Sequence, residues 1–223
     1  MNARRALFFR ARMTGRDDDA LRWTEEALEV AAAHDMVPWH NELQTFRAIA
    51  LAATGRLDEA LEQVEAAHHA APAIGSPALV AWAGAVRGCL LAAEDPRAGR
   101  AASDVAVRAC EDLDYPIGSG VGRRTLGALA LRDGELDAAR DHLRRALDAY
   151  SGLGYAAEVA LSLRWLARLA QASGRPDAVD VLLRAGGGAR GDVVEDVLRP
   201  AALDRRAGPP PPLTEALVLA RSL

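Results

Sequence analysis

The chain of 223 residues has a formal net charge of -4, and 50% of its residues are hydrophobic, as in an ordinary water-soluble protein. All 27 basic residues are arginine, so neither a Walker-type phosphate loop nor a Schiff-base lysine can be built. The arginines do not cluster into a basic tail, and no apolar run approaches the roughly 18 residues of a spanning helix. We expect a cytoplasmic protein with no membrane contact and no direct nucleic-acid binding.

A short turn that begins with glycine or aspartate recurs at intervals of 40, 40, 39 and 40 residues. Each turn lies between two alanine-rich runs whose apolar residues have helical spacing, which predicts a helical hairpin. Aromatic residues make up only 4% of the chain, which favours closely packed helices over a sheet sandwich. The sequence therefore predicts an all-α solenoid of about five hairpins over residues 1–185. The turns begin at Gly15, Gly55, Asp95, Gly134 and Gly174.

Helix starts are marked by proline and aspartate. Three leading helices have a proline near their first residue, where its fixed φ and missing N–H cost least. The trailing helices open with an aspartate three residues after the turn, where a carboxylate can accept hydrogen bonds from free backbone N–H groups. These acids are therefore interpreted as structural. The prolines are Pro38, Pro77 and Pro116, and the aspartates are Asp18, Asp58, Asp137 and Asp177.

Small residues recur where the two helices of a hairpin must approach each other. They are Ala48, Gly88, Gly127 and Ala167 before the turns, and Ala20, Ala60, Ala139, Ala27, Ala67 and Ala146 after them. The third repeat departs from this pattern, with Arg100 where alanine is expected. This ladder resembles the tetratricopeptide repeat, although the period near 40 exceeds the family's 34. The resemblance implies a right-handed superhelix whose leading helices line a concave surface.

The two ends of the chain are expected to be special. Gly186-Gly187-Gly188 ends the last repeat, and residues 186–207 are predicted to form a capping helix, with Asp192 to Arg206 helical. Residues 208–223 are predicted to be a proline-rich linker and a short terminal helix that must dock, because it is too short to be stable alone. The first helix looks clipped, so we expect either a fragment of a longer protein or a first repeat that packs on a partner.

Signs of catalysis or metal binding are few. Glu65, His68 and His69 form the one metal-like local pattern, and a di-metal bundle needs such a pair twice. Cys89 and Cys110 are predicted to be buried thiols, because their places on antiparallel helices put them too far apart for a disulfide. No catalytic residue, metal or cofactor is expected, and an α-helical enzyme with a dispersed site stays the minor alternative.

The resemblance to tetratricopeptide proteins directs attention to the concave surface. Its last two rows are rich in arginine around apolar neighbours, which suits an acidic segment with an apolar anchor. The alternative is that these arginines are ordinary solvated residues. The candidate groove residues are Trp82, Arg124, Arg132, Leu161, Arg164, Arg168 and Gln171.

Residues 138–154 and 166–175 also resemble the C-terminal repeat region of large LuxR-like, ATPase-type transcriptional regulators from bacteria. That resemblance implies a sensory or docking segment. We therefore predict a non-enzymatic scaffold that binds a protein or peptide partner, with small-molecule inducer sensing in the groove as the alternative. Whether the chain forms a homo-oligomer or belongs to a larger polypeptide stays open.

Overall fold

The computed structural model describes residues 2–187, 190–200, 203 and 210–223, with side chains described from residue 6 onward. These residues form twelve helices and no strand, so the predicted all-α, solenoid-like fold is confirmed. The helices are α1 (Asn2–Met13), α2 (Asp17–Ala33), α3 (Val37–Ala53), α4 (Leu57–Ile74), α5 (Pro77–Leu91), α6 (Pro96–Asp112), α7 (Pro116–Asp133), α8 (Leu136–Ser151), α9 (Ala156–Ala172), α10 (Pro176–Ala185), α11 (Val193–Leu198) and α12 (Leu213–Ser222).

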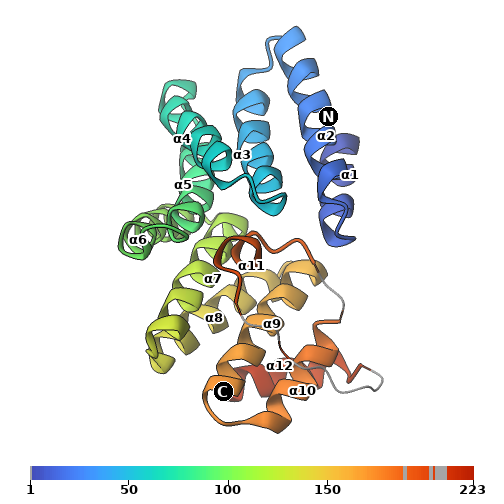
Figure 1. Cartoon of the computed structure of the whole chain (residues 1–223), viewed down its shortest axis with the longest axis vertical. Helices are drawn as coiled ribbons and strands as arrows, with labels where there is room; N and C mark the ends of the chain where they lie inside the picture. The colour runs from blue at the N-terminus through green and yellow to red at the C-terminus, as the bar shows by residue number, and fades with distance from the viewer. Residues whose placement is uncertain (1, 188–189, 201–202, 204–209) are drawn as a thin grey trace.

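The first ten helices form five hairpins arranged in two layers (Figure 1). The leading helices α3, α5, α7 and α9 contact one another in sequence. Each of the trailing helices α2, α4, α6 and α8 packs on its own hairpin partner and on the next leading helix, and α10 packs on α9 and α12. The trailing helices are amphipathic: in α8, Ala139, Leu143, Ala146, Leu147 and Tyr150 form one buried stripe. By contrast, α7 is buried on every side from Gly118 to Ala130, because α5, α6, α8, α9 and α11 surround it.

Helix starts follow the sequence only in part. Proline stands in the first turn of α3, α5 and α7, as predicted. The expected aspartate caps are wrong in detail: α2, α4, α8 and α10 have Arg16, Arg56, Glu135 and Arg175 at the N-cap, without a side-chain cap hydrogen bond. The aspartates lie inside the first turn, where they still favour the positive end of the helix dipole. Capping instead occurs at Asp95 of α6, whose Oδ1 accepts hydrogen bonds from the backbone N–H groups of Arg97 and Ala98.

We predict that Asp95→Ala lowers the free energy of unfolding by about 1 kcal/mol, because two N–H groups of α6 lose their acceptor. Asp58→Ala is the matched control, since this acid of the first turn of α4 caps nothing and its loss removes only a dipole interaction of a few tenths of a kcal/mol. Urea unfolding of both variants measures the difference. Equal losses would contradict the assignment of the cap.

The hairpins close through the small residues that the sequence pattern identified. A Cβ at Gly88 would lie 2.7 Å from the backbone nitrogen of Ser103, and one at Gly127 would lie 2.6 Å from Leu143 Cδ2. The third repeat follows the same rule one residue earlier than expected. The backbone N–H just before α6 bonds four residues back, Asp95 N to Leu91 O, where the corresponding N–H groups of the other four hairpins bond five residues back, so Gly99 and not Arg100 faces α5. Arg100 points outward and pairs with Asp133 at 2.6 Å.

The C-terminal segments differ from the predicted arrangement. Within residues 186–207, the described part contains only the six-residue α11, and α11 lies on α3, α5 and α7 instead of covering the last repeat. Figure 1 shows it at the centre of the molecule, between the first and second halves of the solenoid. Helix α12 is what packs on α10 and α9, with Ala216 and Ala220 fully buried. The remaining residues of the predicted capping helix and linker, 188–189, 201–202 and 204–209, lie outside the described residues.

The two cysteines and the possible metal ligands were checked against the positions of their side chains. Cys89 and Cys110 are buried free thiols. Among the described residues, no group of three or more histidine, cysteine and acidic side chains is placed to hold a metal ion, and no described helix is long and apolar enough to cross a membrane.

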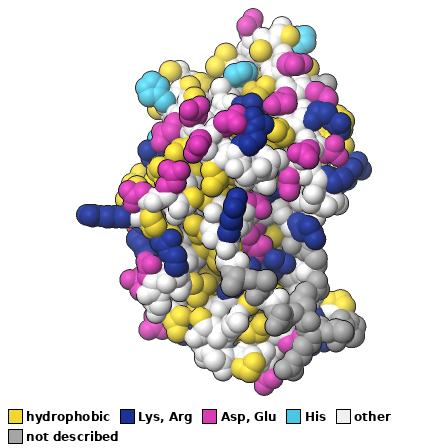
Figure 2. All heavy atoms as spheres, in the orientation of Figure 1, with side chains coloured by type: hydrophobic (Ala, Val, Ile, Leu, Met, Phe, Trp, Pro, Cys, Tyr) yellow, Lys and Arg dark blue, Asp and Glu magenta, His cyan; other side chains and the backbone are white. Residues whose placement is uncertain are grey.

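Figure 2 shows one face, on which histidines lie toward the end formed by α2–α4 and apolar side chains form a central band bordered by arginines.

Candidate functional site

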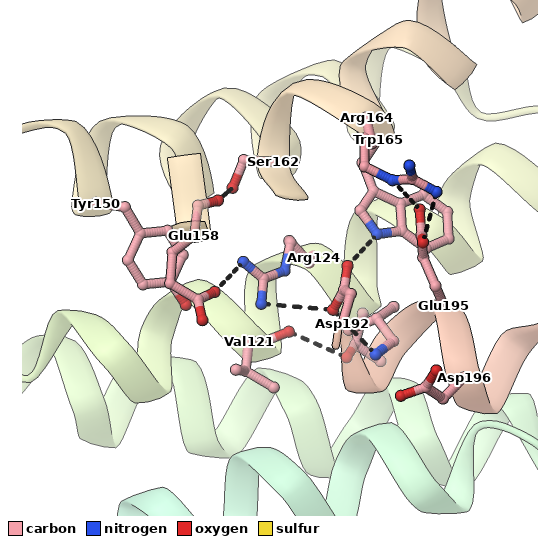
Figure 3. Close-up of polar contacts among 12 residues, drawn as sticks. Val121, Arg124, Tyr150, Glu158, Ser162, Arg164, Trp165, Asp192, Glu195 and Asp196 are labelled. Atoms are coloured by element: carbon pink, nitrogen blue, oxygen red, sulfur yellow. Dashed lines mark hydrogen bonds and ion pairs between the residues drawn. The ribbon is translucent and has the colours of Figure 1, made fainter. Parts of the chain in front are cut away.

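The site is the inner surface of the solenoid together with the segment of residues 190–200 that occupies it. Arg124, on the enclosed helix α7, lies at its centre and is only 1% exposed. Its Nη1 donates to Glu158 of α9 at 2.6 Å, and its Nη2 lies 3.5 Å from Oδ1 of Asp192 (Figure 3). The guanidinium also lies over the Tyr150 ring, 5.2 Å from its centroid. Arg124 therefore joins the solenoid to the inserted segment.

Asp192 is the buried end of that segment. Its Oδ1 accepts the backbone N–H of Val194 at 3.1 Å, which makes Asp192 the N-cap of α11. Its Oδ2 accepts the indole N–H of Trp165 at 2.7 Å. A carboxylate with no exposed surface is thus satisfied by a guanidinium, an indole and a backbone amide, as a buried charge requires.

Glu195 is held one helical turn further along α11. Arg164 donates to both of its carboxylate oxygens, from Nε at 3.1 Å and from Nη2 at 2.9 Å, in a bidentate pair (Figure 3). Arg168 adds a third hydrogen bond at 2.8 Å, and its guanidinium lies 4.9 Å from the Trp165 ring centroid. Two arginines on one face of α9 therefore bind a single glutamate.

The N-terminal hairpin completes the enclosure. Arg12, at the end of α1, pairs with both Asp17 and Asp196 and is 3% exposed. Gly191 has a φ of +87°, and a Cβ there would lie 2.9 Å from the backbone carbonyl of Arg12. The segment can enter the groove beside α1 only because this residue is glycine.

Apolar contacts lie between these ion pairs. Val193, Val194 and Val197 of α11 are buried against the inner layer. Phe8, Phe46 and Trp82 form a ring cluster beneath, with centroids 5.0 Å apart for Phe8 and Phe46 and 5.8 Å apart for Phe46 and Trp82. Trp82 and Leu161 were predicted as groove anchors, and they are 4% and 3% exposed because this cluster and the segment cover them.

The two remaining candidates lie at the other end of the groove. Arg132 and Gln171 line a cavity of about 310 Å³ at the C-terminal ends of α7 and α9. Leu198, Pro200 and Leu203, which follow the acidic part of the segment, line its other side. The seven predicted residues thus lie along one surface. Five of them surround α11: Trp82, Arg124, Leu161, Arg164 and Arg168. Arg132 and Gln171 lie at the cavity, which Arg168 also lines.

Burial and charge oppose each other within the site. Burial by itself lowers the pKa of Arg124, and the charges of Asp192 and Glu158 outweigh it and raise the pKa, so the guanidinium stays protonated. Burial lowers the pKa of Arg168, and the negative charge of Glu195 raises it by less than burial lowers it. Burial raises the pKa of Asp196, against the influence of Arg12. Burial also raises the pKa of the nearby Cys89 thiol to about 12.

Sequence reasoning missed the acidic half of the site. Asp192, Glu195 and Asp196 lie in the predicted capping helix, and Trp165 was not among the candidate groove residues. One signal points to them: residues 192–197 read Asp-Val-Val-Glu-Asp-Val, and such a mixture of acids and branched aliphatic residues complements arginines on an apolar surface. The alternative of solvated arginines does not hold for Arg124, Arg164 and Arg168, which are all ion-paired.

Comparison with known proteins supports the fold alone. No protein-family model matches the chain, and a search of curated proteins gives no match. Among solved structures, the chain is similar to BtubC (BKLC) from P. vanneervenii, with a TM-score of 0.54 and 17% sequence identity over 89% of this chain and 80% of that one. The likeness agrees with a helical-repeat-like, all-α architecture.

Proposed function

We propose that the chain is a non-enzymatic protein-interaction scaffold of the tetratricopeptide-like type, whose inner surface binds an acidic and apolar segment of a partner protein. One observation carries the proposal: the arginines of the groove already hold a segment of this chemistry, residues 192–198. The groove therefore has the donors and the apolar floor that such a ligand needs.

The ion pairs between the groove and α11 favour a surface that recognises a specific ligand over one that is only filled by its own chain. A buried ion pair is on balance weakly stabilising, and apolar residues of similar volume often replace it without loss. A segment that merely filled the groove would need no such pairs. Arg124, Arg164 and Arg168 instead select carboxylates at set positions, which is how a binding surface acquires specificity.

The chemistry of the site also supports a non-enzymatic role. The arginines that surround α11 are engaged by carboxylates. Cys89, the thiol of the inner layer, is fully buried with a pKa of about 12, and a thiol in that state is a poor nucleophile at neutral pH.

We further propose that this scaffold is the docking or sensory segment of a bacterial transcriptional regulator or signalling protein in the cytoplasm. The resemblance of residues 138–154 and 166–175 to the repeat regions of LuxR-like regulators supports this setting. In it, the chain is part of a larger polypeptide or assembles with further copies, and the groove receives a partner's segment.

Site-directed photo-crosslinking tests the proposal in cells that express the full chain. A photoreactive phenylalanine at Phe9, which lines the groove, is compared with one at Val105, which is 61% exposed on the outer helix α6. We expect protein adducts from position 9 that map by mass spectrometry to an acidic, aliphatic segment. Adducts from position 105 alone, or adducts at position 9 with basic segments, would overturn the assignment of the groove.

Small-molecule sensing is the second candidate, and the cavity at Arg132 is the observation that favours it. A volume of about 310 Å³ with mostly apolar walls and two arginines suits an amphipathic carboxylate. Thermal-shift screening of such acids against the wild type and Arg132→Gln tests it. A ligand of the cavity stabilises the wild type and loses most of that effect in the variant, whereas equal shifts in both, or none, would count against the cavity.

A further inference from the structure

We propose that residues 190–200 are a built-in competitor for the groove, and that the partner carries a segment of the same pattern, which binds by displacing them. This inference rests on the proposed function and adds to it the sequence that the groove reads. It also means that the groove is self-occupied until a partner of sufficient affinity arrives.

The contacts of α11 define the pattern. The first acid, Asp192, meets Arg124 and Trp165 and caps the short helix. The acid three residues later, Glu195, meets Arg164 and Arg168, and the next residue, Asp196, meets Arg12. Branched aliphatic residues fill the positions one, two and five after the first acid. The partner segment is therefore a short helix of nearly two turns, with acids at positions 0, +3 and +4 and branched aliphatic residues at +1, +2 and +5.

The local structure of the segment makes it separable from the solenoid. A helix of six residues is far too short to be stable without its docking contacts. Gly187 and Gly191 before it and Arg199 after it have positive φ values, so the chain turns sharply on both sides. Displacing α11 therefore unfolds six helical residues, while the five hairpins keep their own contacts with one another.

Covalent connection gives the segment its advantage over a free ligand. A ligand that is covalently joined to its binding site acts at an effective concentration of about millimolar. A partner segment with the same contacts must overcome this concentration, so its apparent affinity is its intrinsic affinity multiplied by the fraction of molecules in which the groove is open. Weakening the hold on α11 should consequently strengthen binding of the partner.

Two kinds of variant vacate the groove by different routes. Gly191→Ala adds a Cβ against the Arg12 backbone and strains a left-handed residue. Its control, Gly154→Ala, carries the same type of strain at a φ of +69° with no atom within 4 Å. Asp192→Asn/Glu195→Gln/Asp196→Asn removes the three carboxylates of the segment. Its control, Asp58→Asn/Glu62→Gln/Asp112→Asn, makes the same charge change at exposed positions outside the groove.

The probe is a fluorescein-labelled peptide of residues 190–200, and fluorescence anisotropy measures its binding to each full-length chain. We expect at least tenfold tighter binding to the two vacated variants than to the wild type and the two controls. A scrambled peptide should bind none of them. Circular dichroism and thermal melting establish which variants keep the helical fold.

Two results of the anisotropy experiment would overturn the inference. Equal affinity for the wild type and a folded vacated variant would mean that the segment does not compete, although the groove would still bind acidic peptides as the proposed function requires. No binding to any folded variant would mean that the segment is not a ligand of the groove, and crosslinking from position 9 would then decide the proposed function separately.

A measurement on the wild type guards against variants that fail to fold. Hydrogen exchange at the amides of Val193 to Leu198 is followed as unlabelled peptide is added at millimolar concentration. Displacement predicts faster exchange at these amides with the 190–200 peptide and no change with the scrambled peptide. If exchange stayed unchanged with both peptides, even when the added peptide exceeds the effective concentration of the tethered segment, displacement would be refuted.

Discussion

Replacing Gly99 with alanine should lower the free energy of unfolding by about 3 kcal/mol, near the upper end of the range for overpacking a closely packed contact. A Cβ at this position would lie 2.5 Å from Cα and 2.6 Å from the backbone nitrogen of Ala92. Backbone atoms cannot rotate away as a flexible side chain can, so α5 and α6 would have to separate. Urea unfolding followed by circular dichroism measures the loss.

Gly152→Ala is the matched control for this prediction. Gly152 has a φ of -66°, which any residue adopts, and the nearest atom to an added Cβ is Asp148 O at 4.0 Å. The control should be neutral or slightly stabilising, because alanine reduces the freedom of the unfolded chain. If Gly99→Ala were as stable as Gly152→Ala, the close approach of α5 and α6 in the shortened third repeat would be wrong.

Replacing Arg124 with methionine should lower the free energy of unfolding by about 4 kcal/mol, the usual cost of removing one partner from a buried ion pair. The change leaves Asp192, whose side chain has no exposed surface, with its charge uncompensated, and it also deprives Glu158 of its partner. The same urea experiment measures this loss, and hydrogen exchange should show α11 opening before the hairpins.

Arg132→Met is the control for charge and size. This arginine comes from the same helix, but its side chain is 48% exposed and its contact with Asp133 is long, at 3.7 Å. Its replacement should change stability by no more than about 0.5 kcal/mol, as for other surface substitutions. Similar losses for the two variants would show that Arg124 is not held in a buried network.

Much of the solenoid could be predicted from local patterns. The spacing of the turns determines the hairpins, and prolines mark the starts of α3, α5 and α7 because their geometry suits a first helical turn. Gly88 and Gly127 indicate close packing because the helices they join leave no room for a Cβ. The aspartate caps were misassigned because each aspartate lies two residues past the N-cap, and the helix dipole favours an acid in the first turn whether or not it caps. Arg100 was misassigned because the third hairpin has one residue fewer between its close-packed positions, Gly88 and Gly99, than the fourth has between Gly127 and Ala139.

The candidate site could be predicted only by half. The resemblance to tetratricopeptide proteins identified the surface, and its arginines indicated an acidic ligand. The position of Asp192 and Glu195 depends on contacts with Arg124 and Arg164, which are 68 and 31 residues away in the chain. A six-residue helix has too little periodicity of its own to reveal where it docks. The acidic ligand that the arginines indicated was therefore a segment of the same chain, and the sequence around Asp192 and Glu195 did not show that it docks in the groove.

A double-mutant cycle between Arg124 and Asp192 tests most directly whether the groove grips the acidic segment. The free energies of unfolding of the wild type, Arg124→Met, Asp192→Asn and the double variant are compared. Direct pairing predicts a coupling energy of at least about 1.5 kcal/mol, with the double variant destabilised by less than the sum of the single losses. Additivity within about 0.5 kcal/mol would contradict the pairing, and with it the account of the groove.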